Sequence, residues 1–264
     1  MGRSKDLAKN TAILTFGKIC TQSISFFMLP LYTSLLNTAE YGLFDLLVTY
    51  AALLLPLVNW QLDQGLFRFM LDVRGQIDKQ THLFSTVFLT SMIQSVVFCI
   101  LFFIIYPFLT LEHADFLLYY VILHIYTAMF LQFARGLGKT SKYAVASFIS
   151  ALATVILNVL ALAILKLGLR GLFIATISAQ VFTIFYLIMV TKCWRFFSIK
   201  AVKLELFNEV RKYSIPLIPN NLAWWIVNSS DRMVISHFIG ISANGIFTVA
   251  SKFSNVFISF YNVV

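Results

Sequence analysis

The feature that most constrains this chain is a series of apolar segments, each long enough to cross the hydrocarbon core of a membrane. About 20 residues of helix span that core, and such segments recur from residue 11 to the end of the sequence. Hydrophobic residues make up 59% of the chain and charged residues 12%, whereas soluble domains are about 45–50% apolar and about 25% charged. The sequence therefore predicts an all-α polytopic membrane protein.

Eight membrane-spanning helices are expected, because turn-forming residues and polar loops separate the apolar segments. The predicted spans are 11–36, 42–62, 81–108, 116–134, 144–165, 172–190, 214–238 and 244–264. The last span reaches the final residue without a polar tail, which favours a truncated chain: either a fragment of a longer membrane protein or the product of a degenerate gene. The three cysteines show no metal-ligand spacing, so we expect neither a metal nor a cofactor.

Positive charge is distributed unevenly over the loops. Most of the 20 Lys and Arg residues fall in the N-terminal tail, after the second and fourth predicted spans, and in the connector 191–213. The positive-inside rule places these regions in the cytoplasm. We therefore expect a multi-pass protein of a bacterial or archaeal cytoplasmic membrane with a cytoplasmic N-terminus. Contact with anionic lipids explains the net charge of +9 better than nucleic-acid binding does.

Polar residues within the predicted spans recur at helical spacing and form stripes along one face. Interhelical hydrogen bonds would explain the isolated Ser and Thr residues. An ionised group near the bilayer centre costs roughly 2.5–3.5 kcal/mol, so it normally faces water or a partner. The charged residues therefore favour a water-filled, net positive cavity that suits an anionic substrate. The candidate cavity residues are Lys18, Gln22, Asn158, Gln180, Trp224, Trp225, Asn228, Arg232, Lys252 and Asn255.

Further charged residues are candidates for a gate and for ion coupling. Asp63 and Arg68 follow the second span, where they either pair across a turn and hold a cytoplasmic gate or are simply solvated. Arg135, at another cytoplasmic helix end, suits helix C-terminal carbonyls or lipid phosphate. Asp45 and Asp231 lie within spans and are candidates for coupling an ion. Because neighbouring residues point about 100° apart on a helix, we expect Asp231 to pair with another helix or to sense a coupling cation, while its neighbour Arg232 shares the polar stripe.

Three motifs occur in order along the chain. Residues 60–69 read WQLDQGLFRF, residues 132–139 read QFARGLGK, and residues 213–219 read YSIPLIP. They resemble elements of the polysaccharide-biosynthesis transporters, the O-antigen and exopolysaccharide flippases related to the multidrug and toxic compound extrusion (MATE) fold. The first motif has Trp60 where that family commonly has glycine. The resemblance implies a two-lobe helix bundle, here a six-helix N-terminal lobe and the first two helices of the C-terminal lobe.

The resemblance also divides the chain into three parts. Residues 1–190 would form the N-terminal lobe, residues 191–213 a basic amphipathic connector on the cytoplasmic surface, and residues 214–264 the start of the second lobe. Residues 41–44 (YGLF) match residues 244–247 (NGIF) at an offset of 203. Internal repeats are common in transporter folds, and this offset fits a second lobe that begins near residue 214.

The family resemblance implies a flippase that moves an undecaprenyl-pyrophosphate-linked oligosaccharide across the cytoplasmic membrane by alternating access. The expected partners are this lipid-linked oligosaccharide, anionic membrane lipids and glycan polymerase or assembly proteins. No covalent step is required, so we do not expect an enzyme. A cation-coupled multidrug or metabolite antiporter of the same fold is the alternative, and it would favour acidic cavity residues. A polysaccharide polymerase or ligase would need a large outer loop with acid–base residues, and the predicted outer loops are short.

Overall fold

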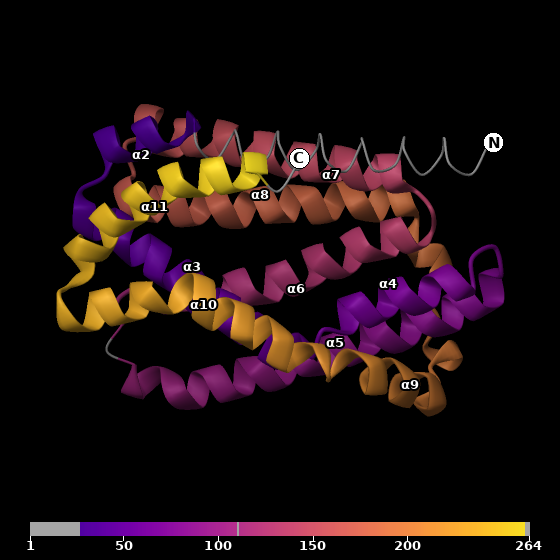
Figure 1. Cartoon of the computed structure of the whole chain (residues 1–264). Helices are drawn as coiled ribbons and strands as arrows, with labels where there is room; N and C mark the ends of the chain where they lie inside the picture. Colours follow the sequence, from indigo (N-terminus) through magenta and orange to yellow (C-terminus); the bar gives the residue numbers. More distant parts are fainter. Residues whose placement is uncertain (1–26, 110, 262–264) are drawn as a thin grey trace. The chain divides into compact units, whose positions relative to one another are not determined.

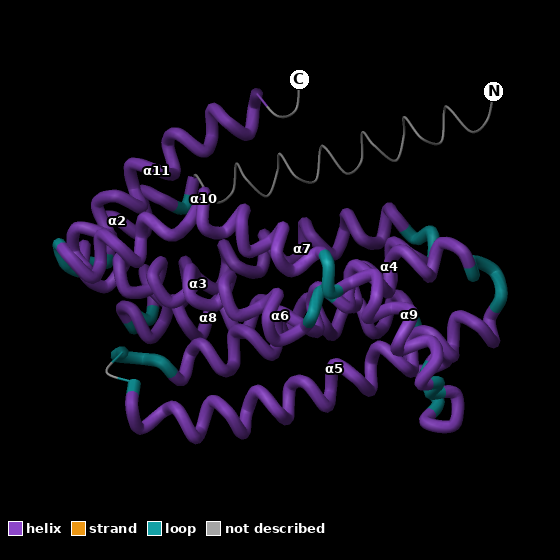
Figure 2. The backbone as a smooth tube through the Cα atoms, turned by 60° about the horizontal axis from the view of Figure 1, so that its bottom comes forward, coloured by secondary structure: helices purple, strands orange, loops and turns teal. Residues whose placement is uncertain are grey.

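The computed structural model describes residues 27–109 and 111–261, with side chains described up to residue 254. All regular structure in these ranges is helical (Figures 1 and 2). The α-helices are α2 (Leu29–Leu35), α3 (Thr38–Asn59), α4 (Leu62–Asp72), α5 (Ile77–Ile105), α6 (Asp115–Gly136), α7 (Thr140–Asn158), α8 (Gly168–Thr191), α9 (Leu204–Ser214), α10 (Leu217–Phe238) and α11 (Ile241–Tyr261). Shorter helical segments are η1 (Tyr106–Phe108), η2 (Val159–Ile164, a π-helix that continues α7), η3 (Cys193–Phe196) and η4 (Ile199–Ala201).

Helices occupy the second to eighth predicted spans. By length and composition, five of them can cross a membrane within the described residues: Thr38–Asn59, Ile77–Phe108, Asp115–Gly136, Thr140–Ile164 and Gly168–Thr191. The last two helices, α10 and α11, lie within about three residues of the predicted bounds but are not among these five, and polar residues interrupt both. Most of the predicted first span lies outside the described residues. The chain is thus a multi-pass helical membrane protein.

The segment after the second span, expected as a loop, contains helix α4. A reciprocal capping pair begins α3: Asn37 Oδ1 accepts the Glu40 backbone N–H at 2.8 Å, and Glu40 Oε2 accepts that of Asn37 at 2.9 Å. After α3, Trp60 and Gln61 adopt left-handed backbone conformations, with φ of 50° and 55°, and turn the chain into α4. Apolar residues on one face of α4 are buried, so its amphipathic pattern explains why it folds.

The described chain divides into two compact units, each built from segments far apart in the sequence. Unit 1 contains Met1–Thr49, Thr140–Thr183 and Ser229–Val264, and unit 2 contains Tyr50–Lys139 and Ile184–Asn228. Three helices, α3, α8 and α10, continue from one unit into the other along the chain. The division into lobes at residues 190 and 213 stays a prediction.

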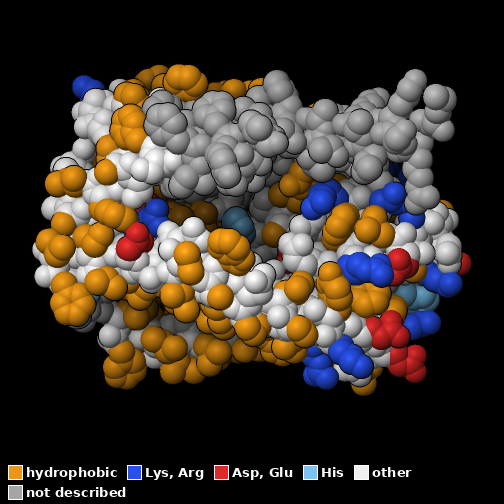
Figure 3. All heavy atoms as spheres, viewed as in Figure 1, with side chains coloured by type: hydrophobic (Ala, Val, Ile, Leu, Met, Phe, Trp, Pro, Cys, Tyr) orange, Lys and Arg blue, Asp and Glu red, His pale blue; other side chains and the backbone are white. Residues whose placement is uncertain are grey.

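In unit 2, α4 is the central packing element and contacts α5, α6 and α9. Glycines allow the close approach: a Cβ on Gly136 would lie 2.6 Å from the side chain of Met70, and one on Gly65 would collide with the Ser214 hydroxyl. Between α5 and α6 the rings of Phe84 and Phe133 lie 4.3 Å apart. Charged side chains gather where α4 and α9 lie, whereas hydrophobic side chains cover much of the remaining visible surface (Figure 3).

In unit 1, α2 packs against the π-helical end of α7. The rings of Tyr32 and Tyr41 stack with centroids 5.6 Å apart, and Phe44 meets Phe173 of α8 at 5.9 Å. Tyr32 and Tyr41 belong to an apolar core of α2, α3, η2 and α8 side chains, and Phe44 packs against it. The core holds the first turns of α3 in place, and those turns carry the residues described next.

Candidate functional site

A close helix crossing in unit 1 joins the two copies of the internal repeat. A Cβ on Gly42 of α3 would collide with the carbonyl oxygen of Ile241, and one on Gly245 of α11 would collide with that of Thr38. Residues 38 and 241 differ by the same offset of 203 as residues 42 and 245, so the contacts are reciprocal. Equivalent residues thus meet around a local pseudo-two-fold axis, and each helix needs glycine at the crossing point.

Two hydrogen bonds flank this crossing. Asn244 Nδ2 donates to the carbonyl oxygen of Gly42 at 2.8 Å, and Thr248 Oγ1 donates to Asp45 Oδ2 at 2.8 Å. Asn244 and Thr248 are fully buried. Asp45 and Thr248 are themselves equivalent in the repeat, since 203 residues separate them. Neither Asn244 nor Thr248 was a predicted site residue, although Asn244 begins the second copy of the repeated sequence.

An ion pair joins α10 to the same carboxylate. Arg232 Nε lies 2.8 Å from Asp45 Oδ2, and the two side chains are only 14% and 17% exposed. Asp231 was expected to pair with another helix or to sense a coupling cation. Its carboxylate is 49% exposed and lies 4.0 Å from the neighbouring guanidinium, while its Oδ1 accepts the Arg232 backbone N–H at 2.9 Å. The interhelical ion pair is therefore made by Asp45 of α3 and not by Asp231. It forms because Asp45 lies at the crossing of α3 and α11, within reach of Arg232.

Lys252 completes the charged group one turn beyond Thr248 on α11. Its ammonium lies 5.3 Å from the ring centroid of Tyr41 and 5.7 Å from that of Tyr32. Both distances allow cation–π attraction, which strengthens where water is excluded. Asn158 Nδ2 donates to the Tyr32 hydroxyl at 2.7 Å and is fully buried. Asn158, predicted as a cavity residue, thus positions one of the two rings that face Lys252.

The predicted excess of positive charge counted Lys18, which lies outside the described residues. Asp45 and Asp231 balance Arg232 and Lys252, so the four described groups carry no net charge. The polar stripes on α10 and α11 marked the two cations, but spacing along one helix could not reveal that α3 brings a carboxylate to Arg232. We call Asp45, Arg232, Thr248 and Lys252, together with the two tyrosine rings, the charged cluster.

The remaining predicted cavity residues lie elsewhere or outside the described side chains. In unit 2, Trp224 is exposed and Trp225 is half-buried, while Asn228 Nδ2 donates to the Trp224 carbonyl at 2.7 Å. Gln180 of α8 is buried, and its Oε1 has no hydrogen-bond partner among the described residues. Three predicted side chains fall outside the description: Lys18, Gln22 and Asn255.

Asp63 and Arg68 do not pair with each other, and Asp63 is not solvated either, so neither of the two predicted arrangements is formed. Asp63 is buried and accepts hydrogen bonds from Asn59 Nδ2 and Gln64 Nε2, both at 2.9 Å. Burial raises the pKa of the Asp63 carboxyl above its ordinary value, and these hydrogen bonds act against that rise. Arg68 instead pairs with Asp72 one turn along α4 at 2.7 Å, on an exposed face. The helical conformation of α4 causes this exchange, since residues four apart meet on a helix.

Arg135 stacks on an aromatic ring of α4. Its guanidinium lies 4.3 Å above the ring of Phe67, and Nη1 donates to Gln132 Oε1 at 3.1 Å. The C-terminal carbonyls of α6 are bound by Arg74, whose Nε donates to Gly136 O at 3.0 Å and Nη2 to Arg135 O at 3.3 Å. Arg74 was not predicted to have this role, because no local pattern indicates which loop arginine reaches a distant helix end.

Within the described residues, no group of three or more His, Cys, Asp or Glu side chains is arranged to hold a metal ion. In unit 1 the carboxylate of Asp45 is shared by the guanidinium of Arg232 and the hydroxyl of Thr248, and an ammonium lies against aromatic rings. Such an arrangement can bind a charged ligand and release it again.

Comparisons with known proteins agree with this description. Residues 7–264 match a family model described as polysaccharide biosynthesis protein, and a comparison with curated proteins found no match. Among solved structures, the chain is similar to a MATE crystal structure in complex with Br-NRF, with TM-score 0.66 and 16% identity over 97% of this chain and 64% of that one. A proline-to-alanine mutant of MATE gives TM-score 0.64 and 15% identity over 95% and 61%. The chain spans less than two thirds of both structures, and the likeness shows a MATE-like fold.

Proposed function

Because the chain belongs to the family of polysaccharide biosynthesis proteins, we propose that it serves to flip an undecaprenyl-pyrophosphate-linked oligosaccharide, a repeat unit of O-antigen or exopolysaccharide. The direction is from the cytoplasmic to the outer leaflet, by alternating access and without a covalent step. The single observation that carries the proposal is the charged cluster, in which Arg232 and Lys252 are held among transmembrane helices next to one exchangeable carboxylate.

The pyrophosphate would compete with Asp45 for the guanidinium of Arg232. Arginine binds phosphate in a bidentate, charge-assisted manner, and a pyrophosphate carries more charge than one carboxylate. Displacement of Asp45 would also weaken its hydrogen bond with Thr248, which links α3 to α11. Substrate binding would thereby loosen the glycine crossing, and separation of the two repeat copies would open the path. Lys252 offers a second cation to the same headgroup.

The other expected contacts belong to this proposal. The polar and aromatic side chains of α10, Trp224, Trp225 and Asn228, would meet sugar by stacking and hydrogen bonding. The basic residues near α4 and α9 would face the cytoplasm and bind anionic lipids of a bacterial or archaeal inner membrane. Glycan polymerase or assembly proteins would receive the flipped repeat unit.

A cation-coupled antiporter of multidrugs or metabolites is the second candidate. The two acids near Arg232 favour it, because Asp45 and Asp231 offer carboxylates to a cationic substrate. The likeness to MATE structures concerns the fold and does not distinguish the two candidates.

The experiment is gene complementation in a strain whose own flippase gene has been deleted, with glycan display, lipid-linked intermediates and drug susceptibility measured together. The variants are Arg232→Ala and Lys252→Ala, with Lys18→Ala added for the first span and Lys200→Ala of η4 as a matched exposed control. We expect the full gene to restore display, and Arg232→Ala and Lys252→Ala to lower it by at least about tenfold at equal expression, the effect of about 1.4 kcal/mol. Lipid-linked oligosaccharide should then accumulate.

Two outcomes would overturn the proposal. Normal display in both cluster variants would exclude the charged cluster as the headgroup site. Raised drug sensitivity in the deletion strain, with glycan display unchanged, would favour the antiporter.

A further inference from the structure

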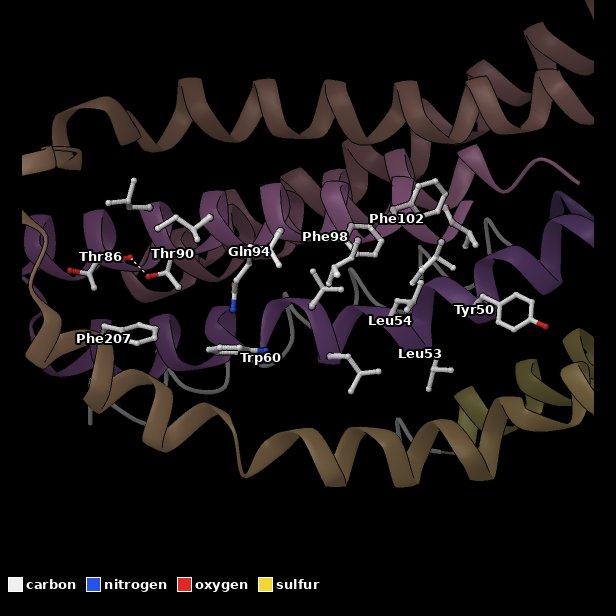
Figure 4. A pocket seen from close by; sticks show the side chains of 18 of the residues that line it. Tyr50, Leu53, Leu54, Trp60, Thr86, Thr90, Gln94, Phe98, Phe102 and Phe207 are labelled. Atoms are coloured by element: carbon white, nitrogen blue, oxygen red, sulfur yellow. Dashed lines mark hydrogen bonds between the residues drawn. The ribbon is translucent and has the colours of Figure 1, made fainter. Parts of the chain in front are cut away.

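Unit 2 contains a long apolar groove that is separate from the charged cluster in sequence and composition. Its volume is about 1220 Å³, and α3, α5 and α9 supply most of its lining. Figure 4 shows these side chains in a row from Thr86 and Phe207 at one end to Tyr50 at the other. On α5 the lining runs from Thr86 to Ile105, which is about 30 Å at 1.5 Å per residue. The groove is therefore as long as the hydrocarbon core is thick.

Apart from Tyr50 and Lys203, which line its two ends, the polar residues of the groove form one row on α5. Thr86 and Thr90 donate their hydroxyl hydrogens to backbone carbonyls one turn earlier, at 2.7 and 2.8 Å, so their donors are occupied. Gln94 is different: its amide nitrogen and oxygen are both buried, and neither has a hydrogen-bond partner among the described residues. In Figure 4 the Gln94 amide points toward the ring of Trp60. An unpaired amide within hydrocarbon costs free energy, which indicates that a ligand other than a saturated chain meets it.

One end of the groove is basic. Lys203, at the start of α9, is exposed and lines the groove next to Thr86, whose hydroxyl oxygen accepts the Lys203 backbone N–H at 3.1 Å. A lysine ammonium at the mouth of an apolar groove suits a phosphate. The groove thus matches an amphiphile with an anionic head and one long chain.

We infer that this groove binds the isoprenoid chain of a polyprenyl phosphate carrier, with the phosphate near Lys203. Length selects this occupant over a phospholipid: an acyl chain reaches about half the hydrocarbon core, about 15 Å, whereas the groove continues through both leaflets. A single groove also suits one chain better than two. The π electrons of an isoprenoid double bond can accept a weak N–H contact, as aromatic rings do, and the amide nitrogen of Gln94 would donate it; a saturated acyl chain offers no such acceptor. The inference rests on the proposed function and adds a loading position for the carrier: its phosphate is held near Lys203 first and reaches Arg232 and Lys252 only when the headgroup is translocated.

The chain offers a matched pair of variants. Ile93 and Ile100 both lie on α5 and are both 56% exposed, but Ile93 lines the groove and Ile100 does not. Ile93→Trp fills the groove, and Ile100→Trp adds the same bulk to the same helix elsewhere. Gln94→Leu removes the amide without adding bulk.

The experiment reconstitutes the protein in phosphatidylglycerol vesicles with a polyprenyl phosphate that carries a photoactivatable diazirine in its tail. Mass spectrometry locates the crosslinks. We expect labelling of α5 between residues 93 and 105 that unlabelled polyprenyl phosphate suppresses and added phosphatidylglycerol does not. Ile93→Trp should lower this labelling about tenfold, Gln94→Leu should lower it less, and Ile100→Trp should leave it unchanged.

Three results would overturn the inference: equal competition by phosphatidylglycerol, equal labelling of the Ile93→Trp and wild-type proteins, or an equal loss in both tryptophan variants. Failure of the proposed function remains distinguishable. If the groove is labelled but the gene does not restore glycan display, the flippase function is excluded and the lipid-binding groove is supported. If display is normal but the groove is not labelled, the groove is excluded and the flippase function is supported.

Discussion

Neutralising Asp45 tests whether its ion pair with Arg232 stabilises the crossing of α3 and α11. The charged atoms are 2.8 Å apart, and two unit charges at that distance attract by about 6 kcal/mol at an effective dielectric constant of about 20. Dehydration of both groups offsets most of this attraction. Because both side chains are more than four fifths buried, solvent screening is weak, and we expect a net coupling energy of about 2 kcal/mol.

A double-mutant cycle isolates this coupling energy. The free energy of unfolding in detergent micelles would be measured for the wild type, Asp45→Asn, Arg232→Gln and the double variant. Each single variant should lose about 2–3 kcal/mol, because one charge stays buried without its partner. The double variant should lose about as much as either single variant, since no unpaired charge remains. Asp231→Asn is the control on the neighbouring carboxylate, and a change within about 0.5 kcal/mol is expected there.

Additive losses in the two single variants would refute the coupling between Asp45 and Arg232. If the two single losses sum to the loss of the double variant within about 0.5 kcal/mol, the residues are not energetically coupled, and the displacement of Asp45 by a phosphate could not loosen the crossing. A large loss in Asp231→Asn would likewise show that the exposed acid holds Arg232.

Three further predictions concern the crossing, a helix end and a buried acid. Gly42→Val should destabilise the protein by about 3 kcal/mol in the same unfolding assay, because its side chain would meet the backbone carbonyl of the opposite helix; wild-type stability would contradict the close approach. Arg74→Ala should lower the free energy of unfolding by about 1 kcal/mol, because it removes hydrogen bonds to the end of α6. The control Arg68→Ala removes only an exposed ion pair and should change stability little. Equal effects of the two substitutions would contradict the capping role of Arg74. Burial raises the pKa of Asp63, so the folded state binds its proton more tightly than the unfolded state and loses stability as the pH rises through that raised pKa. Asp63→Asn should therefore increase the melting temperature at pH 9 and leave it nearly unchanged at pH 4, while Asp72→Asn should show no such pH dependence.

The sequence predicted the helices of this protein well, because each apolar segment is bounded by turn-forming residues and has the length of a membrane span. It did not predict α4, where an amphipathic pattern lies in a segment that its charges marked as a loop. The offset of 203 correctly marked two equivalent segments. That the two copies touch could not be predicted from their spacing, since a repeat fixes equivalence and not contact.

The candidate site was predicted in part. Arg232, Lys252 and Asp45 were named, and the structure brings all three into one region of unit 1. Their partners were assigned less well, because an ion pair between helices depends on which helix crosses which. Asp63 shows the same limit: local spacing suggested Arg68, but burial selected the neutral amides of Asn59 and Gln64.

The polar character of the α3–α11 crossing has a consequence for movement. Interhelical hydrogen bonds within membranes contribute on average about 0.6 kcal/mol each, and the crossing has two of them beside an ion pair of about 2 kcal/mol. The glycines bring the two backbones together at the crossing point. Separation of the helices there does not disrupt close packing between large apolar side chains. Opening should then cost a few kcal/mol, a difference that the binding of one multiply charged headgroup can supply.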